Sequence, residues 1–234
     1  MEFNRWDATE GIMEIQTIKT DISFSLEHNF SVTVELLRIN DLWKIEVPHI
    51  LENKELVYQL SSADNLVDKY ADILNNAFKK YNFINIRRNV KHRFICLSST
   101  QINKTVILPS TVEISDDFSK YGIRRKSWDG DDYCYRGFGT IMNGDLLSWC
   151  IENSHFMDDD STIIGVRTDE NYRGNGYAAS NVAALCNYLQ GKGMSTIYYE
   201  CALDNIASYR TAQKANLEYI GEVHYLSFQD KTHK

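Results

Sequence analysis

Apolar residues recur along the chain with two periods, and these periods predict an alternation of strands and helices. The clearest helix begins after an N-cap at Ser62 or Asp64, because the apolar side chains that follow are spaced three or four residues apart. They are Leu66, Tyr70, Ile73, Leu74, Phe78 and Tyr81. Segments rich in β-branched residues predict strands at 22–37, 42–47, 83–86 and 93–97. We therefore expect residues 1–104 to form an α+β domain, with the boundary at the polar stretch 98–105.

The second part of the chain, 105–234, is predicted to begin with strands and to end with alternating strands and helices. Asn143-Gly144 is a strong signal for a two-residue turn, so 133–142 and 146–152 should form a hairpin. Other elements follow from apolar content and spacing. They are a first strand within 106–114, a short helix at 116–121, strands at 162–168 and 195–201, helices after Ala178 and Asn205, and a last strand within 217–228.

The segment Arg173-Gly174-Asn175-Gly176-Tyr177-Ala178 connects the strand at 162–168 to its helix. Glycines without a Cβ let the backbone turn tightly, and the first N–H groups of a helix have no internal acceptor. This connection can therefore bind an anion such as a phosphate, or it can be a simple turn. A P-loop ending is absent, and the dinucleotide motif fits only in part because Ala179 occupies its third glycine position.

The connection fits the pattern R-x-x-G-x-A throughout, with Arg173, Gly176 and Ala178. This pattern resembles the pyrophosphate-binding motif of the GNAT N-acetyltransferase superfamily. Downstream, Asn205, Ser208 and Lys214 follow the order found in that superfamily. The strings 168–178 and 135–139 most resemble its zwittermicin-resistance type. The resemblance implies a mixed central sheet flanked by helices, and direct transfer of acetyl from acetyl-CoA to a primary amine of a small molecule or antibiotic.

The resemblance also implies which residues hold acetyl-CoA. Main-chain groups of Val166 and Thr168 would bind the pantetheine arm, and the amides from Arg173 to Ala178 would bind the pyrophosphate. The cofactor-binding set implied by the resemblance is Val166, Thr168, Arg173, Gly174, Asn175, Gly176, Tyr177, Ala178, Asn205 and Ser208.

The catalytic groups are less well defined by the sequence. Zwittermicin-type relatives tend to have acidic residues where this chain has Ile163 and Arg167, so the candidate general bases are Glu152, Glu200 and His155. Superfamily members commonly carry a tyrosine that protonates the leaving thiolate, but its position is occupied by Ala212. On the same face of that helix, the nearest hydroxyls are those of Tyr209 and Ser208, and Tyr209 has the more suitable pKa.

Composition excludes several other classes of protein. With 234 residues, 43% hydrophobic content and a net charge of −7, the chain is typical of a globular protein and disfavours broad nucleic-acid binding. Its basic stretch, 79–93, is interpreted as an exposed face. Since no run of 18 apolar residues occurs and the first residues are charged, we expect no membrane segment and a cytoplasmic location. The five scattered cysteines are expected in the core, and isolated histidines predict no metal site.

Two classes of function remain open at this point. The first is the N-acetyltransferase described above, acting alone or as a homodimer. The second is a GNAT fold that binds acyl-CoA for regulation or assembly and has lost its chemistry. Because the predicted anion loop is intact, the enzyme is favoured.

Overall fold

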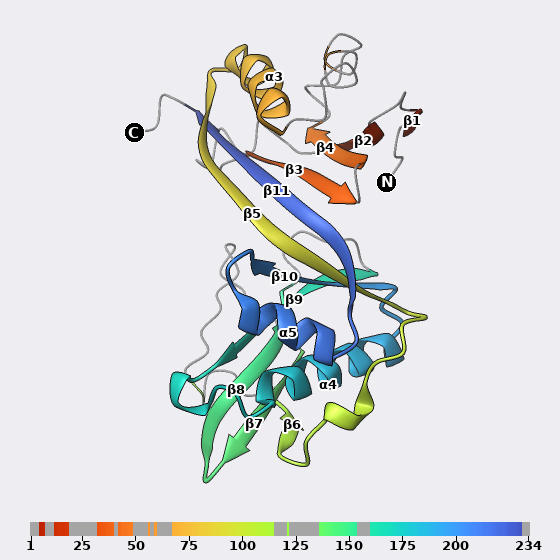
Figure 1. Cartoon of the computed structure of the whole chain (residues 1–234), viewed down its shortest axis with the longest axis vertical. Helices are drawn as coiled ribbons and strands as arrows, with labels where there is room; N and C mark the ends of the chain where they lie inside the picture. Colours follow the sequence, from red (N-terminus) through yellow and green to blue (C-terminus); the bar gives the residue numbers. More distant parts are fainter. Residues whose placement is uncertain are drawn as a thin grey trace. The chain divides into compact units, whose positions relative to one another are not determined.

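The computed structural model describes residues 5–7, 12–18, 32–39, 42–48, 56, 59, 67–114, 121, 136–153 and 160–230. The chain divides into two compact units, one of residues 1–91 and 221–234 and one of residues 92–220. Strands β5 (Phe83–Leu97) and β11 (Glu218–Asp230) are neighbours in the sheet and contribute residues to both units (Figure 1). The expected domain boundary at residue 104 stays a prediction.

The first unit contains a sheet and a helix that packs against it. Its strands are β1 (Arg5–Asp7), β2 (Ile12–Ile18), β3 (Val32–Ile39) and β4 (Leu42–Pro48), together with parts of β5 and β11. Their order is β1-β2-β4-β3-β11-β5. β2 and β4 pair parallel, whereas β1 with β2, β3 with β4, and β3 with β11 pair antiparallel. The predicted strand at 42–47 is confirmed, and the part of the 22–37 prediction that precedes residue 32 lies outside the described residues.

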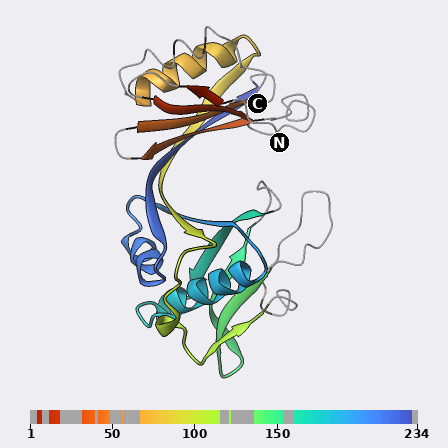
Figure 2. The ribbon, with the colours of Figure 1, turned by 90° about the vertical axis from the view of Figure 1, so that its right-hand side faces the viewer.

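Helix α3 (Val67–Lys79) covers one face of this sheet (Figure 2). Tyr70, Leu74 and Phe78 are fully buried, as their helical spacing predicts. Phe78 stacks on Phe228 of β11, with ring centroids 4.0 Å apart, and also contacts Phe83 of β5. The predicted amphipathic helix is therefore confirmed over residues 67–79, whereas Tyr81 lies in the turn beyond its end and is exposed.

The second unit contains a mixed sheet with the order β5-β10-β9-β8-β7-β6. Its strands are β6 (Thr111–Glu113), β7 (Gly137–Met142), β8 (Asp145–Glu152), β9 (Ser161–Thr168) and β10 (Thr196–Ala202). Strands β6 to β9 pair antiparallel in sequence order, and β9 pairs parallel with β10. Helices α4 (Tyr177–Gly191) and α5 (Ile206–Lys214) follow β9 and β10 (Figure 2). This arrangement confirms the predicted mixed sheet flanked by helices.

Several local predictions are confirmed, and others need correction. Asn143 and Gly144 both have positive φ, 54° and 88°, which suits the turn of the predicted hairpin. The strands predicted at 83–86 and 93–97 are one continuous strand, because the polar residues between them are tolerated where a strand has an exposed side. Within the predicted first strand at 106–114, residues 111–113 form β6, whereas Val106 is the last residue of a 3-10 helix (Lys104–Val106). The short helix predicted from 116 lies almost wholly outside the described residues.

The core of the second unit lies between the sheet and helix α4. Val182, Leu185, Cys186 and Leu189 are fully buried in it. Strand β5 adds Phe94 and Cys96 to the same core. The four described cysteines, Cys96, Cys150, Cys186 and Cys201, are free and buried, so the expectation of core thiols is confirmed for them.

Candidate functional site

Strands β9 and β10 separate near their carboxyl ends. Their parallel register runs from Ser161↔Thr196 to Ile164↔Tyr199, whereas β9 continues to Thr168. An opening between two adjacent strands therefore begins after Ile164. A Cβ built on Gly165 would meet no atom within 4 Å, so the backbone can be approached closely here.

Hydrogen bonds between β8 and β9 decide which main-chain groups face this opening. Asn153 N–H donates to Ile163 O at 2.7 Å, and Asp169 N–H donates to Leu147 O at 2.9 Å. In an antiparallel pair, alternate residues bond to the same neighbour, so the odd-numbered residues of β9 bond to β8. Consequently, the N–H and C=O groups of Val166 and Thr168 point toward the β10 side, as expected for groups that would bind a pantetheine arm.

The connection between β9 and α4 has the geometry of an anion cradle. Gly174 and Gly176 have φ angles of 86° and 82°, in the left-handed region that favours glycine, and a Cβ on either would meet open space. Gly176 is the N-cap of α4 and provides no side-chain acceptor. The first intrahelical bond is made by Ser180 N–H to Gly176 O at 3.0 Å, so the preceding amides can donate to a ligand.

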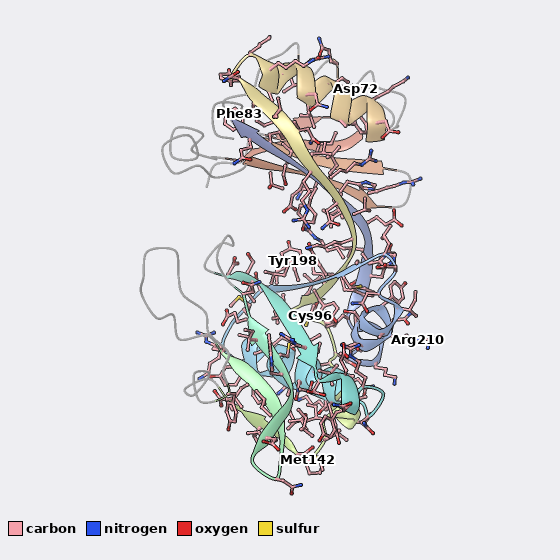
Figure 3. The ribbon with its side chains drawn as sticks, turned by 90° about the vertical axis from the view of Figure 1, so that its left-hand side faces the viewer. Asp72, Phe83, Cys96, Met142, Tyr198 and Arg210 are labelled. Carbon is pink, nitrogen blue, oxygen red and sulfur yellow. The ribbon has the colours of Figure 1, made fainter. Side chains whose placement is uncertain are left out.

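The side chains of this connection bond within it. Asn175 Nδ2 donates to Tyr172 O at 3.0 Å, and Arg173 Nη2 lies 3.3 Å from Glu170 Oε1. Arg173 is 62% exposed and can therefore turn toward an anion. Tyr177 Oη lies 3.3 Å from the sulfur of Met142, at the end of β7 (Figure 3). The residues from Arg173 to Ala178 that the resemblance assigns to the pyrophosphate thus lie together at the start of α4.

A buried polar network joins α4 to the end of β9, and it was not predicted from the sequence. Thr140 Oγ1 donates to Asn181 Oδ1 at 3.2 Å, and Asn181 Nδ2 donates to Ser148 Oγ at 3.0 Å. Ser148 Oγ lies 2.8 Å from Thr168 Oγ1. Three of these four residues are fully buried, Thr168 being the exception. A polar residue directly before the apolar positions of the predicted helix is the signal that could have pointed to Asn181.

Glu152 lies beside the point where β9 and β10 separate. Its register partner on β9 is Ile164, the last residue of β9 that pairs with β10. The side chain is 11% exposed, and its Oε2 lies 3.9 Å from Nε of Arg136. The candidate base His155 lies outside the described residues.

Glu200 is the first residue of β10 beyond the pairing with β9, and it forms a buried ion pair with β5. Arg93 donates to Glu200 Oε1 through both Nε (2.8 Å) and Nη2 (2.7 Å), and the two side chains are 8% and 3% exposed. The Arg93 guanidinium also lies over the ring of Tyr198, which is labelled in Figure 3. Arg93 therefore does not belong to an exposed basic face. Protonation of Glu200 would leave a buried charge without its counterion, which is costly.

The amino-terminal end of α5 carries the two remaining residues predicted to bind cofactor. Asn205 is the N-cap, and its side-chain oxygen accepts from Ser208 N–H at 3.1 Å. Ser208 Oγ lies 2.5 Å from Tyr199 Oη of β10. Burial raises the pKa of Tyr199, although the hydrogen bond to Ser208 lowers it, so this hydroxyl is protonated at neutral pH. Both Asn205 and Ser208 thus fix α5 against the carboxyl end of β10.

Tyr209, the predicted proton donor, packs in an aromatic cluster with side chains of β5 and β11. Its ring centroid lies 4.9 Å from that of His92, 5.0 Å from Phe94 and 5.8 Å from Tyr219. In the sheet order, β5 and β9 lie on opposite sides of β10. The ring therefore contacts the strand on the side of β10 away from the opening, and its assigned role stays a prediction.

Among the described residues no cluster of metal ligands occurs, and two of the thiols are unsuited to nucleophilic chemistry. No group of three potential metal ligands occurs among the described residues. Burial raises the pKa of Cys150 and of Cys201, so these two thiols are protonated and are poor nucleophiles. No described helix is long and apolar enough to cross a bilayer.

Comparison with known proteins agrees with this geometry. Residues 113–216 match the family model described as Acetyltransferase (GNAT) family. A structure from Novosphingobium aromaticivorans assigned to the GNAT family is similar with a TM-score of 0.50 at 16% identity, over 64% of this chain and 68% of that one. A GCN5-related N-acetyltransferase-like protein from Streptococcus suis has a TM-score of 0.49 at 11% identity, over 96% and 82%. No curated protein matches the chain.

The second unit has the GNAT fold, with a mixed central sheet flanked by helices. The match of residues 113–216 to the GNAT family model supports the resemblance at the level of the superfamily. The likeness to the Novosphingobium structure, at 16% identity, concerns the fold alone. The match to the zwittermicin-resistance type stays a prediction.

Proposed function

We propose that this protein is an N-acetyltransferase that moves an acetyl group from acetyl-CoA to a primary amine of a small molecule. The proposal rests on two possible binding surfaces that follow one another along the chain. Main-chain groups of Val166 and Thr168 face the opening between β9 and β10, and the same chain then enters the Gly174–Gly176 cradle before α4. A ligand with an extended amide-containing arm and a pyrophosphate fits both.

The reaction would be a direct transfer. The amine nitrogen attacks the thioester carbonyl carbon, a C–N bond forms, the C–S bond breaks, and coenzyme A leaves as a thiolate that takes up a proton. Holding both reactants in line removes a barrier on the order of 7–11 kcal/mol in favourable cases. Burial of the described thiols at Cys150 and Cys201 supports a mechanism without an acyl-cysteine.

The amine must lose a proton, since an alkylamine with a pKa of about 10.4 is mostly cationic at neutral pH. Of the two described candidate bases, Glu152 is the better one. Glu200 accepts two hydrogen bonds from Arg93, whereas the ion pair of Glu152 with Arg136 is longer, at 3.9 Å. Glu152 also lies opposite Ile164, next to the opening where the thioester would be held.

Tyr209 is our proposed proton donor to the thiolate, and its ring would have to leave the contacts with His92 and Phe94 to reach it. Solvent is the alternative donor. A thiol with a pKa near 8.5 is a tolerable leaving group, so this step needs little assistance.

The decisive experiment measures thiol release from acetyl-CoA in the presence of a panel of amines, together with calorimetric titration of acetyl-CoA. The panel should include antibiotics with primary amines, because the motif strings resemble the zwittermicin-resistance type. We expect micromolar binding and amine-dependent release. Tight binding without release on any amine would favour a binding protein, and no binding would refute the proposal.

A further inference from the structure

The polar network under α4 connects the two parts of the proposed acetyl-CoA site. Thr168 ends β9 at the opening, while Asn181 lies in the second turn of α4, just beyond the anion cradle. We propose that Ser148 and Asn181 are positioning residues that fix the distance between the opening and the cradle. This inference rests on the proposed function, because it concerns the same ligand.

The covalent connection between these two places cannot fix that distance. Residues 169–175 are all exposed. Their recorded side-chain bonds are local, such as Asn171 N–H to Asp169 Oδ1 at 2.9 Å and Asn175 Nδ2 to Tyr172 O. Exposed segments with few packing contacts open at low free energy. The separation must therefore be maintained through the sheet beneath α4.

The hydroxyl of Ser148 uses all of its hydrogen-bonding capacity to join β9 to α4. A hydroxyl has one proton to donate and two lone pairs to accept. Ser148 Oγ donates to Arg167 O at 3.1 Å, so it accepts from Asn181 Nδ2 and from the hydroxyl of Thr168. The hydroxyl thus contacts two successive residues of β9 and one residue of α4, and its removal would leave a buried amide proton unpaired.

A ligand held at both ends gains affinity only when the two sites lie at the correct separation. The second contact is then an intramolecular event at high effective concentration. If the network sets the separation, its loss should weaken binding of whole acetyl-CoA and spare ligands that occupy only one part. A residue that merely stabilises the fold should affect all of these ligands alike or none of them.

The test compares Ser148→Ala with Ser180→Ala. Both serines are fully buried, and Ser180 Oγ is likewise hydrogen-bonded, to Leu108 N–H (2.8 Å) and Thr111 Oγ1 (2.5 Å), neither of which belongs to β9. Both variants should lose similar thermal stability, since the same hydroxyl is removed from a buried site. Calorimetry and NMR titration would give affinities for acetyl-CoA, for ADP as the pyrophosphate probe, and for acetylpantetheine as the arm probe.

For Ser148→Ala we expect acetyl-CoA affinity to fall about tenfold, with the two fragments changed by less than about twofold, whereas Ser180→Ala should bind acetyl-CoA like the wild type. Equal losses in the two variants, or equal losses for fragments and whole ligand, would overturn the inference. Should Ser148→Ala fail to fold, Thr168→Val removes the last hydroxyl of the network and Thr168→Ser keeps it, so only the former should lose affinity. Failure of the wild type to bind acetyl-CoA would instead refute the proposed function.

Discussion

Substitution of Gly176 should weaken ligand binding by the anion cradle more than it destabilises helix α4. Gly176 has a φ of 82°, and a Cβ placed on it would meet no protein atom within 4 Å. Gly176→Val should therefore lower the free energy of unfolding only through the left-handed backbone conformation, which costs roughly 1–2 kcal/mol for a residue with a side chain. For a protein of this size the melting temperature should fall by about 2–4 °C per kcal/mol.

The loss of ligand affinity should be larger than this loss of stability. A valine side chain would occupy the space through which a pyrophosphate reaches the amides of the first turn. Each hydrogen bond to a charged group contributes about 1.5–3 kcal/mol, so losing two of them weakens acetyl-CoA binding at least about 10²-fold.

Gly193 provides the matched control. Its φ is 89°, and a Cβ on it would also meet open space, but it lies just beyond the opposite end of α4. The 15 residues of α4 correspond to about 22 Å. Gly193→Val should therefore lower the melting temperature as much as Gly176→Val and leave acetyl-CoA affinity unchanged. Equal affinities of the two variants by calorimetry would refute the cradle as the pyrophosphate site.

Three further predictions concern titratable and charged side chains. Glu152→Gln should lower kcat for thiol release by ~10²–10⁴-fold with little change in acetyl-CoA affinity; an unchanged kcat would exclude Glu152 as the base. Arg93→Met should lower the free energy of unfolding in urea by about 3–5 kcal/mol. Adding Glu200→Met should restore much of this free energy, because the unpaired buried charge is then removed. A double variant no more stable than Arg93→Met would contradict the prediction. Burial lowers the pKa of His224, so stability should be complete above about pH 6.5 and decline below it, a slope that His224→Gln should remove.

The elements around the candidate site could be predicted from sequence because each depends on local signals. The hairpin turn at Asn143-Gly144 requires two residues that tolerate positive φ, and the chain supplies them. The cradle requires the same property at Gly174 and Gly176. Asn205 is a good N-cap by its side-chain chemistry alone, and it caps α5.

Residues whose environment depends on distant segments could not be predicted. Arg93 belongs to a basic stretch that is typical of an exposed strand, and its burial depends on Glu200, which lies 107 positions away. Tyr209 and Ser208 were predicted from their helical spacing to Ala212, but spacing does not reveal which strand lies beneath each side of α5. In the structure, Ser208 contacts β10 and Tyr209 contacts β5.

The unit that contains the matched segment 113–216 also depends on residues outside that segment, because strand β5 is part of its sheet. β5 lies next to β10 in the sheet and covers the side of β10 that does not pair with β9. Without it, β10 would present an open edge with unpaired main-chain groups. The same strand contributes Phe94 to the core and Arg93 to the ion pair with Glu200, directly after the point where β9 and β10 separate. The opening is thus held on one side by β8 and on the other by a strand from the amino-terminal half of the chain.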